Sequence, residues 1–416
     1  MAVPSTRRVK LKEVCERITV GHVGPMADKY VPDGVPFLRS QNIAPFRLIT
    51  DDIKFVPREF HEKLRKSALR PGDVAVVRTG YPGTACVIPN TFDELNCADL
   101  VVITPSSELN PHYLAAIFNS AWGRASVAGN LVGVAQQHFN IGAAKELEIS
   151  LPTRRMQDRI AGILSAYDEL IENSRRRIKI LESMARALYR GWFIHFRFPG
   201  YESVPLVPSP LGEIPHGWEV KKLGEICARL ESGGTPKRST AEYWDDGTID
   251  WYKTGELWDG FLFEAQEKIT ARGQRESTAR LFEPGTILMA IYGSPTVGRM
   301  GILTKRASCN QAALGLVADK RIISQTYLYF VLYSLRDYFN GLAQGAAQQN
   351  ISKEKVSGAM AVVPSRQVLD SFDDQAVPMF GQIQTLQQQV LVLRRTRDLL
   401  LPLLLSGHID VEAVPA

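Results

Sequence analysis

The chain has 416 residues, of which 45% are hydrophobic and 22% are charged, so it has the composition of an ordinary soluble protein with room for two or three domains. Its five cysteines are scattered and contain no CxxC pair, which argues against a disulfide framework and against a thiolate zinc site. The N-terminus lacks an apolar signal core and the net charge is only +5, so we expect a reduced, cytoplasmic protein that is compatible with an anionic partner without requiring one.

An internal repeat organises the chain. Segments of the first half recur in the same order about 213 residues later: 9–18 as 220–230, 69–88 as 282–303, 110–120 as 324–334, 133–141 as 345–351, and 151–154 as 363–366. Two equivalent domains, each followed by a helix, are typical of a protein that contacts two similar ligands at a fixed separation.

Each repeat begins with short β-like runs that are punctuated by Gly and Pro. We expect strands at 35–38, 74–79, 85–88 and 100–104 in the first repeat, and at 286–292, 301–304 and 313–317 in the second. A helix follows at 111–121 and again at 324–336, so each domain is predicted to be α+β.

Two long helices are predicted after the domains, because apolar residues alternate at spacings of three and four. Thr153 and Ser365 are candidate N-caps, and Pro402 should end or kink the second helix. The two helices most simply pair with each other as an antiparallel coiled coil; the alternative is a two-helix core inside an ordinary domain. The seam carries two polar positions, Ser174 and Arg397, and its apolar residues include Ile160, Leu164, Tyr167, Ile171, Ile178, Leu181, Leu188, Ile383, Leu386, Val390, Leu393 and Leu400.

These patterns divide the chain into five parts. Residues 199–217 are rich in Pro and Gly and are predicted to be an extended linker. The predicted parts are a first repeated domain at 1–151, a central helix at 152–198, the linker at 199–217, a second repeated domain at 218–364, and a C-terminal helix at 365–416.

Catalytic motifs are weak. No GxG occurs to hold a methyltransferase cofactor, no GxxxxGK[ST] predicts an ATP motor, and the histidines show no metal-binding spacing. The NPHY segment at 110–113 resembles an amino-methyltransferase motif, but we interpret it as a helix start. Asp33, Asp52 and Lys54 fit a loose nuclease pattern that the second repeat does not share.

Binding to DNA is better supported, because the repeated loops carry amide, basic and aromatic side chains. The loops contain Gln136, Gln137, His138 and Asn140 in one repeat, and Gln344, Gln348, Gln349 and Asn350 in the other. The alternative is that these Gln and Asn side chains bond to buried backbone groups. The candidate DNA-binding residues are Arg39, Gln41, Asn42, Lys54, Arg58, Lys63, Arg65, Lys66, Arg78, Tyr81, His138, Lys253, Arg272, Arg275, Tyr292, Arg299 and Lys353.

The chain resembles the DNA specificity (S) subunits of type I restriction–modification systems. Segments 171–200 and 393–411 resemble the family's central and C-terminal conserved regions, and 211–226 resembles the entry into its second target-recognition domain. Pro378 departs from the pattern and is expected to delay the second helix until about residue 379.

The resemblance implies a non-catalytic subunit that binds a bipartite, asymmetric site on double-stranded DNA. It implies two methyltransferase (modification) subunits that use S-adenosylmethionine, and restriction subunits that use ATP and Mg, with no cofactor in this chain. The family's base-contacting residues vary too much to carry over, so the candidate residues rest on loop chemistry alone. The alternatives are a coiled-coil assembly scaffold without DNA specificity and, more distantly, a nuclease.

Overall fold

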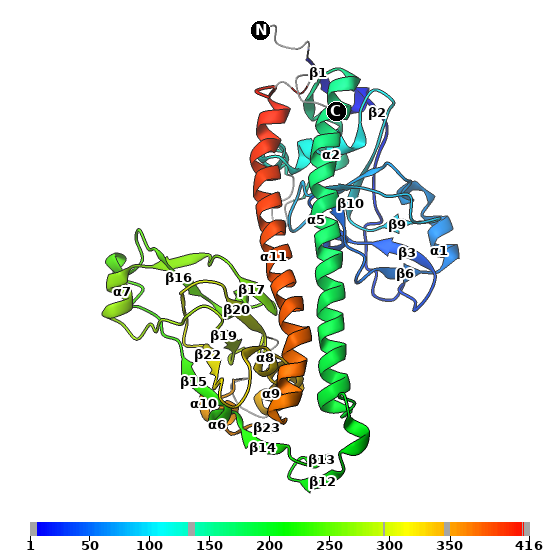
Figure 1. Cartoon of the computed structure of the whole chain (residues 1–416). Coiled ribbons are helices and arrows are strands. Elements are labelled where there is room, and N and C mark those ends of the chain that lie inside the picture. The colour runs from blue at the N-terminus through cyan, green and yellow to red at the C-terminus, as the bar shows by residue number, and fades with distance from the viewer. Residues whose placement is uncertain (1–5, 132–137, 294–295, 345–349, 410, 412–416) are drawn as a thin grey trace. The chain divides into compact units, whose positions relative to one another are not determined.

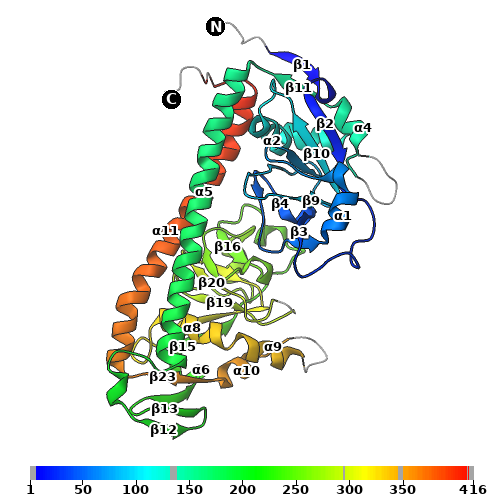
Figure 2. The same ribbon diagram turned by 90° about the vertical axis from the view of Figure 1, so that its right-hand side faces the viewer.

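The structure is a computed structural model that describes residues 6–131, 138–293, 296–344, 350–409 and 411. It divides into two compact units (Figure 1, Figure 2). Unit 1 comprises 1–173 and 390–416, and unit 2 comprises 174–389. Each unit therefore contains one repeated domain together with a segment of each long helix.

The main sheet of unit 1 is antiparallel, with strand order β2-β10-β7-β8. Successive side chains of a strand point to opposite faces, so Val74 and Val76 pack into the core beside the helices, whereas Ala75 and Val77 pack into a second core. Burial on both faces explains why these strands are continuous apolar runs. The elements are β2 (Cys15–Val20), β10 (Leu100–Pro105), β7 (Val74–Val77), β8 (Ala85–Val87), α2 (Pro111–Asn119), α3 (Ala121–Ala128) and α4 (Ile141–Glu146).

Smaller sheets complete unit 1. In the three-stranded sheet β6-β3-β9, β3 pairs antiparallel with β6 and parallel with β9. The remaining elements are β1 (Arg7–Lys10) paired with β11 (Glu148–Leu151), the hairpin β4 (Ile43–Ala44) and β5 (Arg47–Leu48), β6 (Lys54–Val56), β3 (Val35–Leu38), β9 (Asn96–Cys97), α1 (Arg58–Lys63), and the 3-10 helices Leu11–Glu13, Ser40–Asn42 and Arg65–Ser67.

Unit 2 repeats this topology, which confirms the predicted tandem repeat and the α+β class. Its main sheet has the order β15-β22-β19-β20-β17, and its three-stranded sheet has the order β18-β16-β21. The strands are β15 (Cys227–Ser232), β22 (Ala313–Ala318), β19 (Ile287–Ala290), β20 (Met300–Leu303), β17 (Gly260–Leu262), β18 (Glu267–Ile269), β16 (Ile249–Tyr252), β21 (Ser308–Cys309), and β14 (Glu219–Lys222) paired with β23 (Met360–Val363). The helices are α6 (Leu223–Ile226), α7 (Ala271–Arg275), α8 (Gln325–Ser334), α9 (Arg336–Gln344), α10 (Lys353–Gly358), and the 3-10 helices Tyr201–Ser203, Ala241–Tyr243 and Thr254–Glu256.

The predicted helix starts are confirmed at equivalent places. The side chain of Asn110 accepts hydrogen bonds from the N–H groups of His112 and Tyr113 at 2.8 and 3.1 Å, with Pro111 as the first residue of α2. Ser324 likewise accepts from the N–H of Tyr327 at 3.0 Å at the start of α8. The NPHY segment is therefore a helix cap.

The two long helices are α5 (Arg154–Tyr189), followed by a π-helical turn (Arg190–Ile194), and α11 (Arg366–Leu405). Thr153 caps α5, since its hydroxyl accepts from the N–H of Met156 at 3.4 Å. The prediction for Pro378 was wrong, because α11 begins at Arg366 and continues through that proline. Pro402 does not end the helix, which continues to Leu405. A proline inside a helix costs about 3 kcal/mol, and burial of neighbouring apolar residues on α11 offsets that cost.

Within each unit the two helix segments run antiparallel. In unit 1, Ile160 and Leu164 of α5 share a core with Leu401 and Leu404 of α11, and further along α5 Asp168 is ion-paired with Arg397. In unit 2, the ring centroids of Tyr189 and Phe372 lie 6.4 Å apart, whereas Glu182 and Ile383 line one small cavity. In both units, residues later in α5 face residues earlier in α11.

Residues 199–217 do not form the extended connector that was predicted. They contain the hairpin of β12 (Leu206–Ser209) and β13 (Gly212–Pro215). Ile214 of the hairpin is buried with Phe198 and Trp218 in the core of unit 2, and the Trp218 ring lies 5.0 Å from the Phe198 ring. Apolar residues spaced among the prolines explain this packing.

Each domain also contacts α11 at, or just after, a residue with a left-handed backbone. In unit 1, Phe46 has φ 62° at the tip of the β4–β5 hairpin, and its ring lies 4.6 Å from the guanidinium carbon of Arg397. In unit 2, the equivalent residue Asp259 has φ 63° and leads into β17, where the N–H of Phe261 donates to Gln387 at 2.9 Å. The backbone path is repeated, but the contacting side chains are not.

Candidate nucleic-acid interface

In unit 1, three of the sequence-predicted residues converge on one carboxylate at the end of the three-stranded sheet. Asp52 accepts from Arg39 and from Gln41, each at 2.9 Å, and its other oxygen lies 2.9 Å from the ammonium of Lys54. Arg39 also donates to the backbone carbonyl of Asp52 at 2.6 Å. We call Asp52, Arg39, Gln41 and Lys54 the Asp52 cluster.

In unit 2, a similar arrangement surrounds Glu267 at the equivalent end of its sheet. The ammonium of Lys253 lies 2.6 Å from Glu267, and Arg238 is ion-paired with the other oxygen. The guanidinium carbon of Arg238 stacks 3.7 Å from the Trp244 ring and 4.8 Å from the Trp251 ring. We call Glu267, Lys253 and Arg238 the Glu267 cluster.

Both carboxylates are held in the ionised form. Hydrogen bonds from Lys54 and then Arg39 lower the pKa of Asp52 below its ordinary value. The hydrogen bond from Lys253 is the main cause that lowers the pKa of Glu267, and Arg238 adds to it. Each cluster therefore combines one negative group with two positive groups, and so presents a net positive charge.

Local structure explains how the first cation of each cluster is placed. Arg39 directly follows β3 and precedes a 3-10 helix, where its N–H donates to Asn42 at 2.9 Å. Lys253 directly follows β16 and precedes the equivalent 3-10 helix, where its N–H donates to Glu256 at 2.9 Å. The turn fixes the backbone of each cation, and the carboxylate fixes its side chain.

Other candidate residues are engaged within the fold. Asn42 is only 1% exposed, and its amide donates to the carbonyls of Ile49 and Asp52. Arg78 is 8% exposed and bonds to the Phe139 carbonyl and to Asp99. These two side chains maintain loop structure, and their role in DNA contact stays a prediction.

Two amide residues of the twin loops, Asn140 and Asn350, bond to backbone groups, as in the alternative that the sequence left open. Asn140 caps α4 by accepting from Ala143, and Asn350 accepts from the N–H of Gly293. His138 is half-buried. Gln136, Gln137, Gln348 and Gln349 lie outside the described residues, as does the side chain of Gln344.

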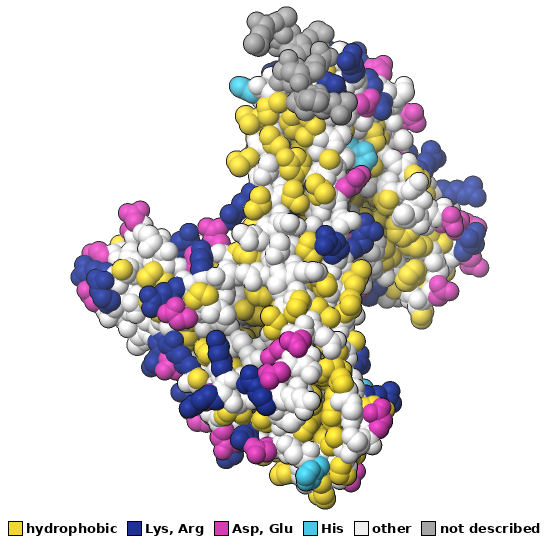
Figure 3. Space-filling model, in the orientation of Figure 1, with side chains coloured by type: hydrophobic (Ala, Val, Ile, Leu, Met, Phe, Trp, Pro, Cys, Tyr) yellow, Lys and Arg dark blue, Asp and Glu magenta, His cyan; other side chains and the backbone are white. Residues whose placement is uncertain are grey.

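Exposed cations lie on the short helices. In Figure 3, Lys and Arg side chains gather over the part of unit 2 that carries α7, together with acidic ones. Arg58 is paired with Glu94, and Arg272 with Glu276. The remaining candidates on or beside these helices and at α10 are exposed: Lys63, Arg65, Lys66, Arg275 and Lys353.

Two loops after the main strands present aromatic side chains. Tyr81 is 84% exposed in unit 1, and Tyr292 is 40% exposed in unit 2. Arg299 stacks 4.7 Å from the ring of Trp258, which is 70% exposed. Trp258, Arg238 and Glu267 were not predicted from the sequence, because only pairing across the fold brings them to the predicted cations.

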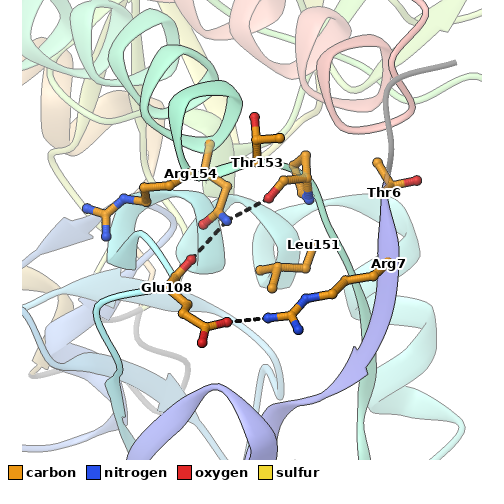
Figure 4. Close-up of a pocket in the computed structure, with 8 residues that line it drawn as sticks. Thr6, Arg7, Glu108, Leu151, Thr153 and Arg154 are labelled. Atoms are coloured by element: carbon orange, nitrogen blue, oxygen red, sulfur yellow. Dashed lines mark hydrogen bonds and ion pairs between the residues drawn. The ribbon is translucent and has the colours of Figure 1, made fainter. Parts of the chain in front are cut away.

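A surface hollow at the start of α5 is lined by polar side chains, several of which bond to other groups of the protein. Figure 4 shows Arg7 paired with Glu108 across it. The amide of Gln157 donates to the carbonyls of Glu108 and Pro152 at 3.0 and 2.9 Å. These side chains bond to one another, so we interpret the hollow as the joint between the first domain and its helix.

Metal chemistry finds no support in the described part of the chain, where no group of three His, Cys, Asp or Glu side chains could hold an ion. Asp52 and Lys54 of the loose nuclease pattern are paired with each other instead. All five cysteines are free, as expected. No helix within the described ranges has the length and apolar character that a membrane span requires.

Comparison with known proteins gives consistent matches. The family of the type I restriction modification DNA specificity domain matches residues 7–183 and 215–360. The MjaIX specificity subunit of Methanocaldococcus jannaschii is 30% identical over 274 residues, which are 64% of this chain and 62% of that protein. The HindI specificity subunit of Haemophilus influenzae is 22% identical over 410 residues, covering 83% of this chain and 88% of that protein. The chain thus spans less than two thirds of the MjaIX subunit.

A solved structure shares the fold. The crystal structure of a type I restriction–modification S subunit from M. genitalium superposes with a TM-score of 0.62 at 16% identity, over 96% of each chain. The similarity covers both repeated domains, in agreement with the repeated strand order of the two units.

Proposed function

The chain belongs to the family of type I restriction modification DNA specificity domains, and from this premise we propose that it is the subunit that recognises DNA sequence in such a system. Each domain binds one half of a bipartite, asymmetric site on double-stranded DNA. The chain supplies recognition, and partner subunits supply the chemistry.

The observation that carries this proposal is the repeated placement of DNA-binding chemistry. Both domains share one strand order, and both hold two cations on a carboxylate at the same end of the same sheet. Lys and Arg contacts to phosphates supply much of the affinity for DNA and make it salt-dependent. Different loop residues on equivalent frameworks suit two half-sites of different sequence.

Partners are proposed from the family. We propose that two methyltransferase subunits dock on the chain and use S-adenosylmethionine to methylate an adenine in each half-site, which must be flipped out of the duplex. Restriction subunits would supply ATP-dependent cleavage with Mg. The named relatives are themselves specificity subunits of type I restriction enzymes, which supports this assignment of roles.

We further propose that α5 and α11 pair along their length as an antiparallel coiled coil that sets the spacing of the half-sites. All twelve predicted apolar seam residues are buried or half-buried. The antiparallel contacts within each unit, such as Asp168 with Arg397 and Tyr189 with Phe372, support the pairing. We propose domain limits of 1–151 and 218–364. We also propose that the complex is cytoplasmic.

The test is to co-express the chain with the methyltransferase encoded beside it and to map methylated adenines by long-read sequencing. We expect a single bipartite motif, and we expect exchange of residues 1–151 for another first domain to change one half only. Assembly of the complex without sequence-dependent methylation or binding would leave only the scaffold function.

A further inference from the structure

We propose that Asp52 and Glu267 are positioning residues for specific DNA binding. Each holds two basic side chains in place for the phosphates of one half-site, and each restrains those cations from binding DNA of any sequence. This inference rests on the proposed function, and it adds the residues that separate specific from non-specific binding.

The two clusters keep the same arrangement of charges but differ in the residues that compose it. Arg39 and Lys253 take the same place, directly after β3 and β16. The carboxylates come from neighbouring places: Asp52 precedes β6, whereas Glu267 begins β18 at the position that Lys54 holds on β6. The second cation comes from β6 in unit 1, as Lys54, but from the loop after β15 in unit 2, as Arg238. One carboxylate between two cations is retained although each residue type differs.

The ion pairs of the two clusters contribute little to the stability of the fold. The side chains of Asp52 and Lys54 are 57% and 42% exposed, and that of Glu267 is 30% exposed. Ion pairs at such positions contribute about 0–1 kcal/mol, because water screens them. Arg39 is less exposed, at 21%, and is the member of the two clusters that contributes most to the fold. Partly exposed ion pairs of this kind in both domains are therefore better explained by a ligand than by stability alone.

The carboxylate affects both the rotamer freedom of the cations and the positive charge that they present. A free Arg or Lys side chain loses rotamer freedom of up to about 2 kcal/mol when it is ordered on a ligand. The carboxylate already orders Arg39 and Lys54, so a correctly placed phosphate meets donors in position. The same carboxylate offsets one of the two positive charges, which weakens the attraction for any phosphate that lies elsewhere.

Removal of the carboxylate should therefore act unequally on specific and non-specific binding. In Asp52→Asn the cations are freed, so affinity for non-specific DNA rises and its salt dependence steepens by about one unit of slope per added phosphate contact. Affinity for the specific site rises less or falls, because Arg39 is no longer held. We expect the ratio of specific to non-specific affinity to fall by about tenfold, comparable to one charge-assisted hydrogen bond.

The experiment uses the full chain in complex with its co-purified methyltransferase. Fluorescence anisotropy across a salt series would compare the duplex defined by methylation mapping with duplexes in which one or both half-sites are scrambled. Asp52→Asn is paired with Asp33→Asn, which makes the same charge change at an exposed residue of the same domain outside the cluster. Asp52→Glu keeps the charge and should retain the ratio.

The expected result is a lower ratio and a steeper non-specific salt slope for Asp52→Asn alone, with unchanged thermal unfolding. Glu267→Gln should have the same effect on discrimination of the other half-site. An equal loss of both affinities, or a match between Asp52→Asn and Asp33→Asn, would overturn the inference and leave the proposed function standing. A wild-type complex that binds scrambled and mapped duplexes alike would overturn both.

Discussion

In unit 1 the β4–β5 hairpin rests on α11 through Phe46, which lies over the guanidinium of Arg397. In unit 2 the equivalent loop rests on α11 through Phe261, whose N–H donates to the neutral Gln387 and whose ring lies 6.2 Å from that of Phe380. The backbone turns alike at both places, but one contact includes a buried charge and the other an amide and two aromatic rings.

The residues that pack the two long helices into each domain core also differ between the units. Where α5 and α11 join the core of unit 1, the packing residues are aliphatic, including Leu164 and Leu401. In unit 2 they are aromatic, with the Phe193 ring 5.0 Å from Phe372 and 4.8 Å from Tyr327. A duplicated backbone thus accommodates different cores, as long as each fills its volume.

The largest loss of stability is expected from truncation of an aromatic side chain where α11 packs into the core of unit 2. Phe372→Ala removes a fully buried ring and should destabilise unit 2 by about 3–5 kcal/mol. Leu401→Ala in unit 1 should cost about 2–5 kcal/mol. Amide hydrogen exchange would report each unit separately. Faster exchange confined to the mutated unit is expected, and equal acceleration in both units for either variant would mean that the units do not unfold separately.

The next effect concerns the two contacts with α11. Arg397→Ala leaves Asp168 partly buried without its partner and should destabilise unit 1 by about 2–3 kcal/mol, below the range for a fully buried pair. Gln387→Ala removes one hydrogen bond to the Phe261 N–H and should cost unit 2 about 1 kcal/mol. Urea unfolding of both variants would test the order. A Gln387→Ala effect as large as that of Arg397→Ala would contradict the distinction between charged and neutral contacts.

A pH dependence should distinguish the contacts further. Burial raises the pKa of Asp168 to about 6, and Arg397 opposes that rise. Since the folded pKa lies above the unfolded value of about 3.9, the folded state binds the proton more tightly. The stability that this group contributes is greatest below about pH 4 and is lost as pH rises through about 6.

The measurement compares unfolding of unit 1 in the wild type and in Asp168→Asn from about pH 4 to 7. The groups facing Asp168 that influence it are Arg397 and Asp398, so both proteins share the other titrations. We expect the wild type to lose stability relative to the variant as pH rises. A relative gain with rising pH would mean that the ion pair outweighs burial. Gln387→Glu would give the contact of unit 2 a titrating group as a counterpart.

The smallest effect is expected at the edge of the unit 1 contact. Arg47 lies 3.8 Å from Glu172, and both side chains are more than a third exposed. Arg47→Ala should therefore change the stability of unit 1 by less than about 1 kcal/mol, and the change should vanish in high salt. A loss of stability in Arg47→Ala that does not depend on salt would show that Arg47 contributes through packing of its aliphatic side chain and not through its charge.

Much of the fold was predicted from local signals, whereas the site was predicted only in part. A strand within 74–79 and the helix caps at Asn110 and Ser324 were confirmed, because apolar runs bounded by turn residues and capping chemistry are properties of neighbouring residues. Arg39, Gln41 and Lys54 were predicted separately as DNA-binding residues, but nothing in the sequence indicated that one carboxylate, Asp52, would hold all three.

The sequence by itself determined the duplication, the α+β composition and the two long helices, since repeated segments and heptad spacing are written along the chain. Only the tertiary structure decided that α11 passes through Pro378 and Pro402, because burial of distant apolar residues outweighs a local penalty. It also decided that 199–217 contains a hairpin, and that Glu267 meets Arg238 at a sequence separation of 29. Pairings of that kind depend on which strands lie side by side, and strand order is set by packing of the whole unit.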